Sequence, residues 1–436
     1  MKTATPPSNR QTQVLVWLAF VLIGGTLGAC KDDCRTTVTY KTYEPVYMLK
    51  DSLRNAVVAL PARTLENPGK IYVRGDYVFV NEPNQGIHVI NNRNPSAPQP
   101  VSFLNIPGNR DLAVRGDILY ADSYIDLVAL DIRDPNQVVL VKRIENVFPA
   151  GDRSATTVLV EYKEKWVTQT TEGDCNGQRN AGRGDSRFLS NDSNGATFSS
   201  KNGGQSAPSA PGKPGVGGSM ARFTIYDRYL YTVGQSEMQL FDITQPADPQ
   251  KGNKINLGNQ WNIETIFPYR SQLFIGSQNG MHIYDNRNPE KPELLSTYQH
   301  VRSCDPVVVE GDYAYVTLRS GTACQGFTNQ LEVLDISDLR KPTPVKIYPM
   351  QNPHGLGIDR ATLFLCEGTH GLKVFNAKDV RQIDQNLLAH FKDLDAYDVI
   401  PLGEVLLVVG KKGLYQYDYS DPKKLKLLSV IPVVRS

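Results

Sequence analysis

Charged and polar side chains recur at one position in this chain, at the start of short apolar segments. Gathered on one rim, such mixed charges could hold a polar ligand, and carboxylate oxygens are the ligands that hard cations such as Ca²⁺ prefer. The simpler interpretation is that strand starts near solvent are polar. The set comprises Arg110, Asp111, Arg222, Glu264, Asp305, His354 and Asp398. A second set follows the next apolar segment and comprises Glu82, Asp122, Tyr124, Arg319, Glu367 and His370.

Signatures of common catalytic and metal centres do not occur in the sequence. It contains no His-Glu-x-x-His, paired Cys-x-x-Cys, Gly-x-Ser-x-Gly, Walker loop or EF-hand pattern. His88 and His282 stand at equivalent points of two similar segments, so a repeat explains them better than metal binding does. Two of three Arg-Gly-Asp triplets also mark one recurring turn, which argues against adhesion. We therefore expect no catalytic residue and no cofactor, and a bound Ca²⁺ has no supporting motif.

The composition excludes some classes of function. Of 436 residues, 40% are hydrophobic and 21% are charged, and Tyr (21) outnumbers Phe (14), as in β-rich chains. Without the leader described next, which carries Lys2 and Arg10, the chain has 45 basic and 45 acidic residues. Nucleic-acid binding and attraction to anionic membranes both need a clustered positive excess, so neither is predicted.

The first 29 residues have the features of an export signal. Lys2 and Arg10 precede an apolar run at 14–23, which is short for a membrane span, and small residues follow. Leu27-Gly28-Ala29-Cys30 resembles the lipobox of bacterial lipoproteins, which implies cleavage before Cys30 and attachment of lipid, including palmitate, to that cysteine. An ordinary secretory leader that contains a cysteine is the alternative. Lys31-Asp32-Asp33 resembles the signal that sends Bacteroidetes-type lipoproteins to the outer face of the outer membrane.

One pattern recurs seven times: an apolar strand that ends in Asp or Asn, followed by a polar turn that often contains Pro. The Asp or Asn residues are separated by 40, 111, 43, 50, 41 and 42 residues, which indicates a repeat of about 42 residues with one long insertion. They are Asn91, Asp131, Asp242, Asp285, Asp335, Asn376 and Asp418. Each copy contains about four short strands, with Arg-Gly-Asp or Glu-Gly-Asp at the first hairpin turn of three copies.

Seven copies of four antiparallel strands predict an all-β chain that folds as a seven-bladed β-propeller. A single four-stranded sheet cannot bury both faces, whereas seven sheets packed radially can. A β-sandwich array is the alternative, but it does not explain the fixed period. We expect a signal peptide at 1–29, a lipid-anchored tether and N-terminal segment at 30–68, and the propeller at 69–436. Residues 47–60 could form a short helix or an outer strand. The Gly/Ser-rich insertion at about 170–219 is expected to be a flexible loop.

The strand motif, seen at 331–337 and 127–132, is similar to the LVIVD repeat, known from predicted propellers of bacterial exported proteins, many of them lipoproteins. Copies one and six depart from the motif with Asn91 and Asn376, and copy seven has Gln416 within the strand. The resemblance implies an architecture and an exported location, but no established activity.

Cysteine usage fits export, where disulfides persist. In a propeller, Cys304 and Cys324 fall in connections on the same face, so we predict a disulfide between them. Closing about 20 residues would stabilise the fold by roughly 3 kcal/mol. Cys366 ends a strand and is expected to be a buried small hydrophobe.

These features together predict a non-catalytic lipoprotein at the outer membrane or cell surface, whose propeller recognises a protein or glycan partner. The alternative is a hydrolase or lactonase-like enzyme with a metal ion in the central channel. In either case the residues at the channel rim are the candidate site.

Overall fold

A computed structural model describes residues 33–149, 154–174, 215–258, 263–301, 303, 306–321 and 326–434. The chain divides into two compact units. One unit is a long β-hairpin and the other is the propeller with the segments that join it, and each is described by itself below.

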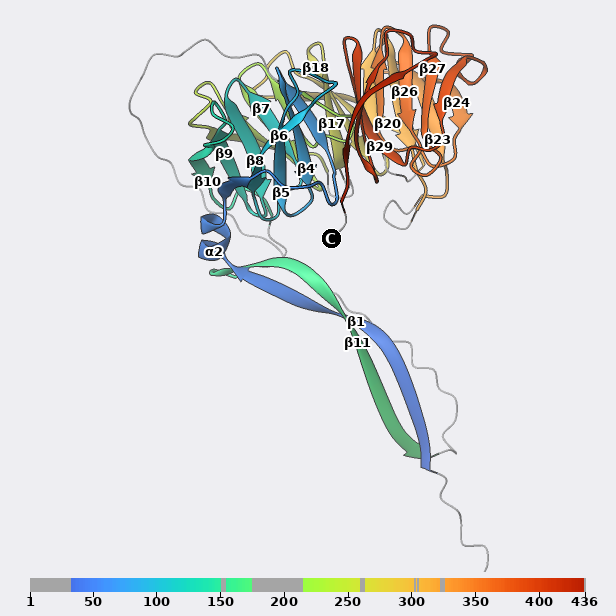
Figure 1. Ribbon diagram of the computed structural model, residues 1–436. Helices are drawn as coiled ribbons and strands as arrows, with labels where there is room; N and C mark the ends of the chain where they lie inside the picture. Colours follow the sequence, from blue (N-terminus) through green and yellow to red (C-terminus); the bar gives the residue numbers. More distant parts are fainter. Residues whose placement is uncertain are drawn as a thin grey trace, which may run out of the picture. The chain divides into compact units, whose positions relative to one another are not determined.

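Seven four-stranded antiparallel blades make up the propeller, as the sequence predicted (Figure 1). In blades one to three the strands are β3 (Ile71–Arg74), β4 (Tyr77–Glu82), β5 (Gly86–Asn91) and β6 (Gln99–Asn105); β7 (Leu112–Arg115), β8 (Ile118–Ser123), β9 (Asp126–Asp131) and β10 (Val139–Ile144); and β13 (Phe223–Tyr226), β14 (Tyr229–Val233), β15 (Glu237–Asp242) and β16 (Gln250–Asn256).

The remaining four blades repeat this order. Their strands are β17 (Ile263–Tyr269), β18 (Gln272–Ser277), β19 (Gly280–Asp285) and β20 (Glu293–Gln299); β21 (Val307–Glu310), β22 (Tyr313–Leu318), β23 (Gln330–Asp335) and β24 (Thr343–Pro349); β25 (Leu356–Asp359), β26 (Thr362–Cys366), β27 (Leu372–Asn376) and β28 (Leu387–Phe391); and β29 (Ala396–Leu402), β30 (Val405–Gly410), β31 (Gly413–Asp418) and β32 (Lys426–Pro432). A short 3₁₀ helix, η1 (Ile383–Gln385), precedes β28.

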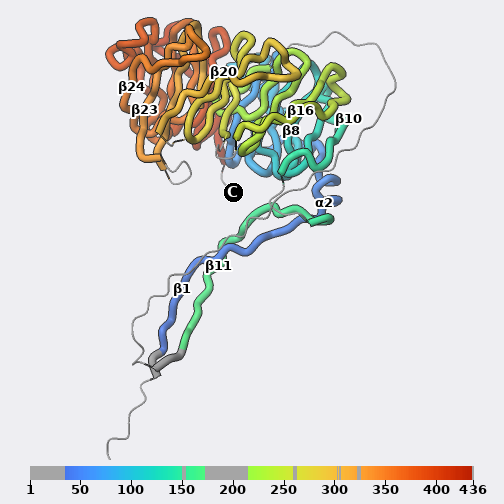
Figure 2. The backbone as a smooth tube through the Cα atoms, turned by 180° about the vertical axis from the view of Figure 1, so that it is seen from behind, coloured from blue at the N-terminus to red at the C-terminus, as the bar shows by residue number. Residues whose placement is uncertain are grey.

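The innermost strands of the blades form a closed ring. Each contacts the innermost strand of the next blade, and β29 of blade seven contacts β3 of blade one. Figure 1 and Figure 2 accordingly show the blades following one another in sequence colour around the propeller.

Burial differs between the inner and outer strands of a blade. The third strand β9 is buried at its first five positions, because neighbouring blades cover both of its faces, and its sequence is therefore apolar from Leu127 to Leu130. The outermost strand β10 has no fully buried position and contains polar residues. Cys366 is fully buried at the end of β26, as predicted.

The recurring Asp or Asn forms the same side-chain turn in all seven blades. Its Oδ1 accepts a hydrogen bond from the backbone N–H two residues later, at 2.8–3.1 Å. An Asn side chain can accept this bond as well as Asp can, so Asn91 and Asn376 preserve the turn.

Side-chain hydrogen bonds also seal the ring between the last blade and the first. Gln416 exchanges two amide hydrogen bonds with Asn92, at 2.6 and 2.8 Å, and Ser429 Oγ donates to the Pro95 carbonyl at 2.6 Å. Gln416, which departs from the strand motif, therefore has a role at the ring closure.

Blade one is extended beyond four strands on both sides. Helix α2 (Lys50–Asn55) is followed by β2 (Val58–Pro61), which pairs with β6, so the 47–60 segment forms both of the elements that the sequence allowed. Arg54 on α2 forms an ion pair with the fully buried Asp126 at 3.1 Å. The short strand β12 (Val216–Gly217) pairs with β3 on the opposite, channel side.

The segment around β12 crosses the channel, although the sequence suggested that a flexible loop extends to Ser219. Gly215 N–H donates to Val114 of blade two, while Ser219 Oγ accepts from the Leu356 N–H of blade six. A Cβ on Gly218 would lie 1.9 Å from Asp398 Oδ2 of blade seven. Close approach to three blades, rather than flexibility, accounts for the glycines here. The rest of the expected loop, residues 175–214, lies outside the described residues.

The hairpin consists of β1 (Asp33–Leu49) and β11 (Thr157–Asp174). Threonine pairs connect its strands, with Thr39 Oγ1 3.1 Å from Thr168 Oγ1, and Lys41 forms a 2.8 Å ion pair with Glu164. Among the described residues, no helix is long and apolar enough to cross a membrane.

Candidate functional site

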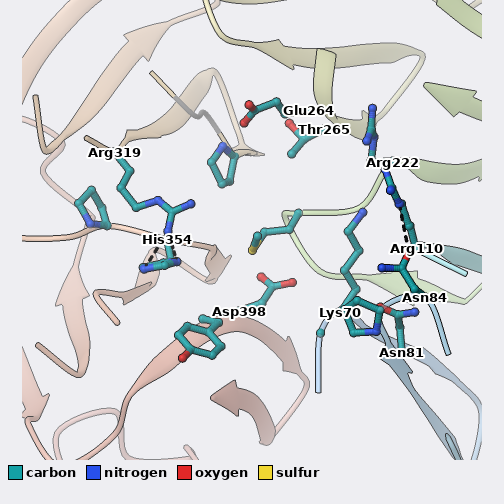
Figure 3. A pocket seen from close by; sticks show the side chains of 16 residues that line it. Lys70, Asn81, Asn84, Arg110, Arg222, Glu264, Thr265, Arg319, His354 and Asp398 are labelled. Atoms are coloured by element: carbon teal, nitrogen blue, oxygen red, sulfur yellow. Dashed lines mark hydrogen bonds between the residues drawn. The ribbon is translucent and has the colours of Figure 1, made fainter. Parts of the chain in front are cut away.

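A pocket of about 590 Å³ lies at the mouth of the central channel, and all seven blades contribute to it (Figure 3). Its lining comprises Gly69, Lys70, Asn81, Pro83, Asn84, Arg110, Met220, Arg222, Glu264, Thr265, Pro306, Arg319, Pro353, His354, Tyr397 and Asp398. The channel-crossing segment borders this pocket, because Met220 belongs to the lining and Gly218 packs against Asp398.

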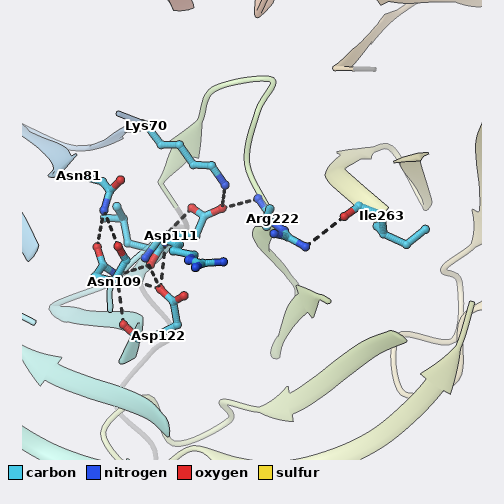
Figure 4. Close-up of polar contacts among 9 residues, drawn as sticks. Lys70, Asn81, Asn109, Asp111, Asp122, Arg222 and Ile263 are labelled. Atoms are coloured by element: carbon cyan, nitrogen blue, oxygen red, sulfur yellow. Dashed lines mark hydrogen bonds and ion pairs between the residues drawn. The ribbon is translucent and has the colours of Figure 1, made fainter. Parts of the chain in front are cut away.

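Lys70, Asp111 and Arg222 connect the first three blades at one wall of this pocket (Figure 4). Lys70 Nζ lies 2.5 Å from Asp111 Oδ2, which also accepts a hydrogen bond from the backbone N–H of Arg222. Burial lowers the pKa of Lys70, an effect that the Asp111 carboxylate opposes and the Arg222 guanidinium reinforces. Arg222 Nη2 donates to the Ile263 carbonyl of blade four at 3.0 Å, which fixes the end of the guanidinium.

Asp122 holds the backbone that carries Arg110 and Asp111. Its Oδ1 accepts hydrogen bonds from the backbone N–H groups of both residues, at 2.8 and 3.0 Å, and from the Asn109 side chain at 3.0 Å (Figure 4). Burial raises the pKa of Asp122 to about 6, against the lowering effect of these backbone hydrogen bonds.

Asp398 is the most buried acid of the pocket lining, at 1% exposure. Its Oδ1 accepts hydrogen bonds from Val399 N–H at 3.0 Å and from Ser219 Oγ at 3.1 Å. Oδ2 has no hydrogen-bond partner among the described residues and lies against Gly218. Burial raises the pKa of Asp398 to about 7, although these hydrogen bonds and Lys70 favour the ionised form. Near neutral pH this carboxyl can therefore either donate or accept a proton.

Arg319 and His354 occupy the opposite wall (Figure 3). Arg319 Nη1 lies 3.0 Å from His354 Nδ1, and the imidazole packs against Tyr397 at 5.5 Å between ring centroids. Burial, and then the adjacent guanidinium, lower the pKa of His354 to about 4, so this ring is neutral at pH 7. The Glu264 carboxylate interacts electrostatically with Arg319 and opposes the lowering of its pKa by burial.

β-bulges direct two of the lining side chains. The register of β17 against β18 shifts at Glu264, and that of β29 against β30 shifts at Tyr397. A bulge leaves one residue outside the ladder and changes the direction of its side chain, which is why bulges occur beside binding sites. These shifts place Glu264 and Tyr397 in the lining.

Five of the seven residues predicted at strand starts line this pocket: Arg110, Arg222, Glu264, His354 and Asp398. Asp111 lies behind them, 3% exposed, and Asp305 lies outside the described residues. Asp111 and Asp398 are buried and each accepts several hydrogen bonds, so both side chains also stabilise the fold.

Sequence reasoning missed Lys70, Met220 and Tyr397. Lys70 directly precedes β3 of the first repeat, as Arg222 directly precedes β13, so the repeat alignment could have identified it. No sequence signal indicated Met220, because its position depends on the channel-crossing segment, or Tyr397, because its position depends on a bulge.

The second predicted set mostly stabilises loops. Only Arg319 of this set lines the pocket. Glu82 and Glu367 are fully buried and form ion pairs with Arg63 at 2.7 Å and Lys373 at 2.5 Å. Tyr124 OH donates to the Val160 carbonyl at 3.2 Å, and His370 is exposed.

Metal ligands are not grouped in the part of the chain that the structure describes, where no cluster of three or more His, Cys, Asp or Glu side chains could hold an ion. The described pocket lining also includes four cationic side chains, which repel a divalent cation. His88 and His282 are buried in their blades, the latter with Nδ1 2.9 Å from Thr297 Oγ1. Cys304 and Cys324 lie outside the described residues, as does Cys30.

Comparisons with known proteins agree with the fold. Residues 302–349 match the LVIVD repeat family. A solved protein from Lactobacillus plantarum is similar, with 13% identity and a TM-score of 0.53 over 84% of this chain and 97% of that one. A periplasmic gluconolactonase from Pseudomonas aeruginosa is similar at 10% identity and a TM-score of 0.52, over 84% of this chain and 98% of its own. No match was found among curated protein sequences. At these identities the likeness extends to the fold alone.

Proposed function

We propose that this chain is an exported lipoprotein, anchored through Cys30 to the outer membrane, whose propeller recognises a protein or glycan ligand without catalysis. One observation carries the recognition role: charged side chains from different blades converge in one pocket of about 590 Å³. Pockets of this size with a few convergent polar groups are typical of ligand sites.

Several features favour recognition over metal-dependent hydrolysis. The described lining combines Lys70, Arg110, Arg222 and Arg319 with only two carboxylates. The one lining histidine is neutral and lies against a guanidinium rather than toward an open coordination site. These groups suit hydrogen bonding to a polar ligand better than coordination of a divalent cation.

An enzyme remains the second candidate because Glu264 and Asp398 line one pocket and the pKa of Asp398 is raised to about 7. A carboxyl that titrates near neutral pH can act as a general acid or base. Metal analysis of the purified protein and lactone- and glycoside-hydrolysis assays distinguish the candidates. Stoichiometric metal, or turnover that Asp398→Asn abolishes, would favour the enzyme.

The recognition role is tested by affinity capture from intact outer membranes. The variant combines Arg110→Ala with Glu264→Ala, two side chains that line the pocket and are not fully buried. The matched control is Arg287→Ala, at an exposed turn of blade four. We expect the double variant to lose a specific ligand that the control retains, at unchanged melting temperature. Equal capture by both proteins would contradict a role for the pocket.

A further inference from the structure

Two arginines of the pocket form no ion pair among the residues that the structure describes. Neither Arg110 nor Arg222 forms an ion pair with any described acidic residue, whereas Lys70 is paired with Asp111. The two guanidinium groups lie on adjacent blades, and Arg110 lowers the pKa of Arg222, although burial lowers it more and the Asp111 and Asp122 carboxylates oppose this with larger effects. An anion between them would relieve this repulsion, and a planar carboxylate matches the guanidinium geometry.

Two buried polar atoms of the lining residues also lack a hydrogen-bond partner within the described part of the chain. They are Nε of Arg222, a donor, and Oδ2 of Asp398. Buried polar groups are nearly always hydrogen-bonded, so each orphan atom needs an explanation. Asp398 is 1% exposed and points into the pocket together with Lys70 (Figure 3). A hydroxyl group could pair with Asp398 Oδ2 whether the carboxyl is protonated or ionised.

The shape of the site limits the size of the ligand. A pocket of about 590 Å³ admits a small molecule or the end of a chain. The lining adds apolar surface from the exposed Pro83, which suits the apolar face of a sugar ring, and a polar group from the exposed Asn84. These features fit one or two terminal residues of a glycan chain.

We propose that the pocket binds the terminal acidic sugar of a glycan, a uronic-acid residue, with its carboxylate at Arg222 and Arg110 and a hydroxyl at Asp398. This proposal rests on the recognition role proposed above and adds the class of ligand. The carboxylate of the sugar would form ion pairs with the two arginines, and its hydroxyl would form a hydrogen bond with Asp398.

The test is isothermal titration calorimetry on the purified protein with galacturonate and glucuronate oligomers. The matched probes are neutral galactose and glucose oligomers of the same length. We expect the acidic oligomers to bind at least tenfold more tightly than the neutral ones. Arg222→Gln and Arg110→Gln should each weaken acidic binding at least tenfold, while Arg287→Gln should leave it unchanged. Because Arg110 is exposed, we expect Arg110→Gln to fold even if Arg222→Gln fails to fold. Arg110→Gln therefore keeps the proposal testable.

The outcomes separate this inference from the recognition role. If acidic and neutral oligomers bind equally tightly and Glu264→Ala abolishes that binding, the acidic-sugar assignment is wrong. The recognition role of the pocket would still hold. Binding of an acidic peptide instead, lost in Arg222→Gln, would also overturn the assignment and identify a protein ligand. If oligomers and peptides all fail to bind, and capture from membranes is unaffected by the pocket variants, both proposals fail.

Discussion

Asp398→Asn should remove much of the pH dependence of this protein's stability between pH 4 and pH 8. The change replaces a buried carboxyl by an amide of the same shape. Its Oδ1 can still accept the hydrogen bonds from Val399 N–H and Ser219 Oγ. The ability to ionise is lost, and an NH2 group takes the place of Oδ2.

The sign follows from the raised pKa. The pKa of Asp398 is about 7 in the folded chain, because burial disfavours the charge, and 3.8 is its ordinary value. The native state therefore binds more protons than the unfolded state between these two values, and stability falls as the pH rises. Below pH 4 the contribution is fully present, and above pH 7 it is lost. Integrated from pH 4 to pH 8, the loss amounts to about 4 kcal/mol.

The assay is urea denaturation of both proteins at half-unit steps from pH 4 to pH 8, with the free energy of unfolding obtained by linear extrapolation. Taking the difference between wild type and variant at each pH cancels other titrating groups, including Asp122, whose pKa is raised to about 6 by burial. Asp312→Asn, at an exposed hairpin turn, makes the same chemical change as a control. We expect the wild type to lose about 4 kcal/mol relative to Asp398→Asn across this range. A difference that stays constant within about 1 kcal/mol would refute the argument.

Three further predictions concern other parts of the chain. Cys30→Ser should abolish palmitate labelling and release the protein from membranes; unchanged labelling would disprove the lipid anchor. Non-reducing peptide mapping should link Cys304 to Cys324, and recovery of both as free thiols from protein prepared without reductant would rule the disulfide out. Gly218→Ala should destabilise the fold by about 1–3 kcal/mol in denaturant titration, because its Cβ would lie 1.9 Å from Asp398 Oδ2; wild-type stability would show that the channel-crossing segment is free to move aside.

The sequence alone determined the blades, because the signals that define them are local. Apolar strands, turn residues and the recurring Asp or Asn act within a few residues of one another, and the seven side-chain turns confirm that pattern. The same repeat also located six of the sixteen residues that line the pocket, since equivalent positions in successive blades face the same channel. Lys70 could have been found in this way as well.

Only the tertiary structure decided what those side chains do. Asp398 is buried because the segment that contains Gly218 and Ser219, about 180 positions earlier in the chain, packs against it. Arg222 forms no ion pair with a described acidic residue, whereas the nearby Asp111 carboxylate is paired with Lys70 of blade one. A protonation state and an unpaired charge depend on the groups that lie nearby in space. In a propeller, these groups come from strands far apart in the sequence, so no local pattern could have revealed them.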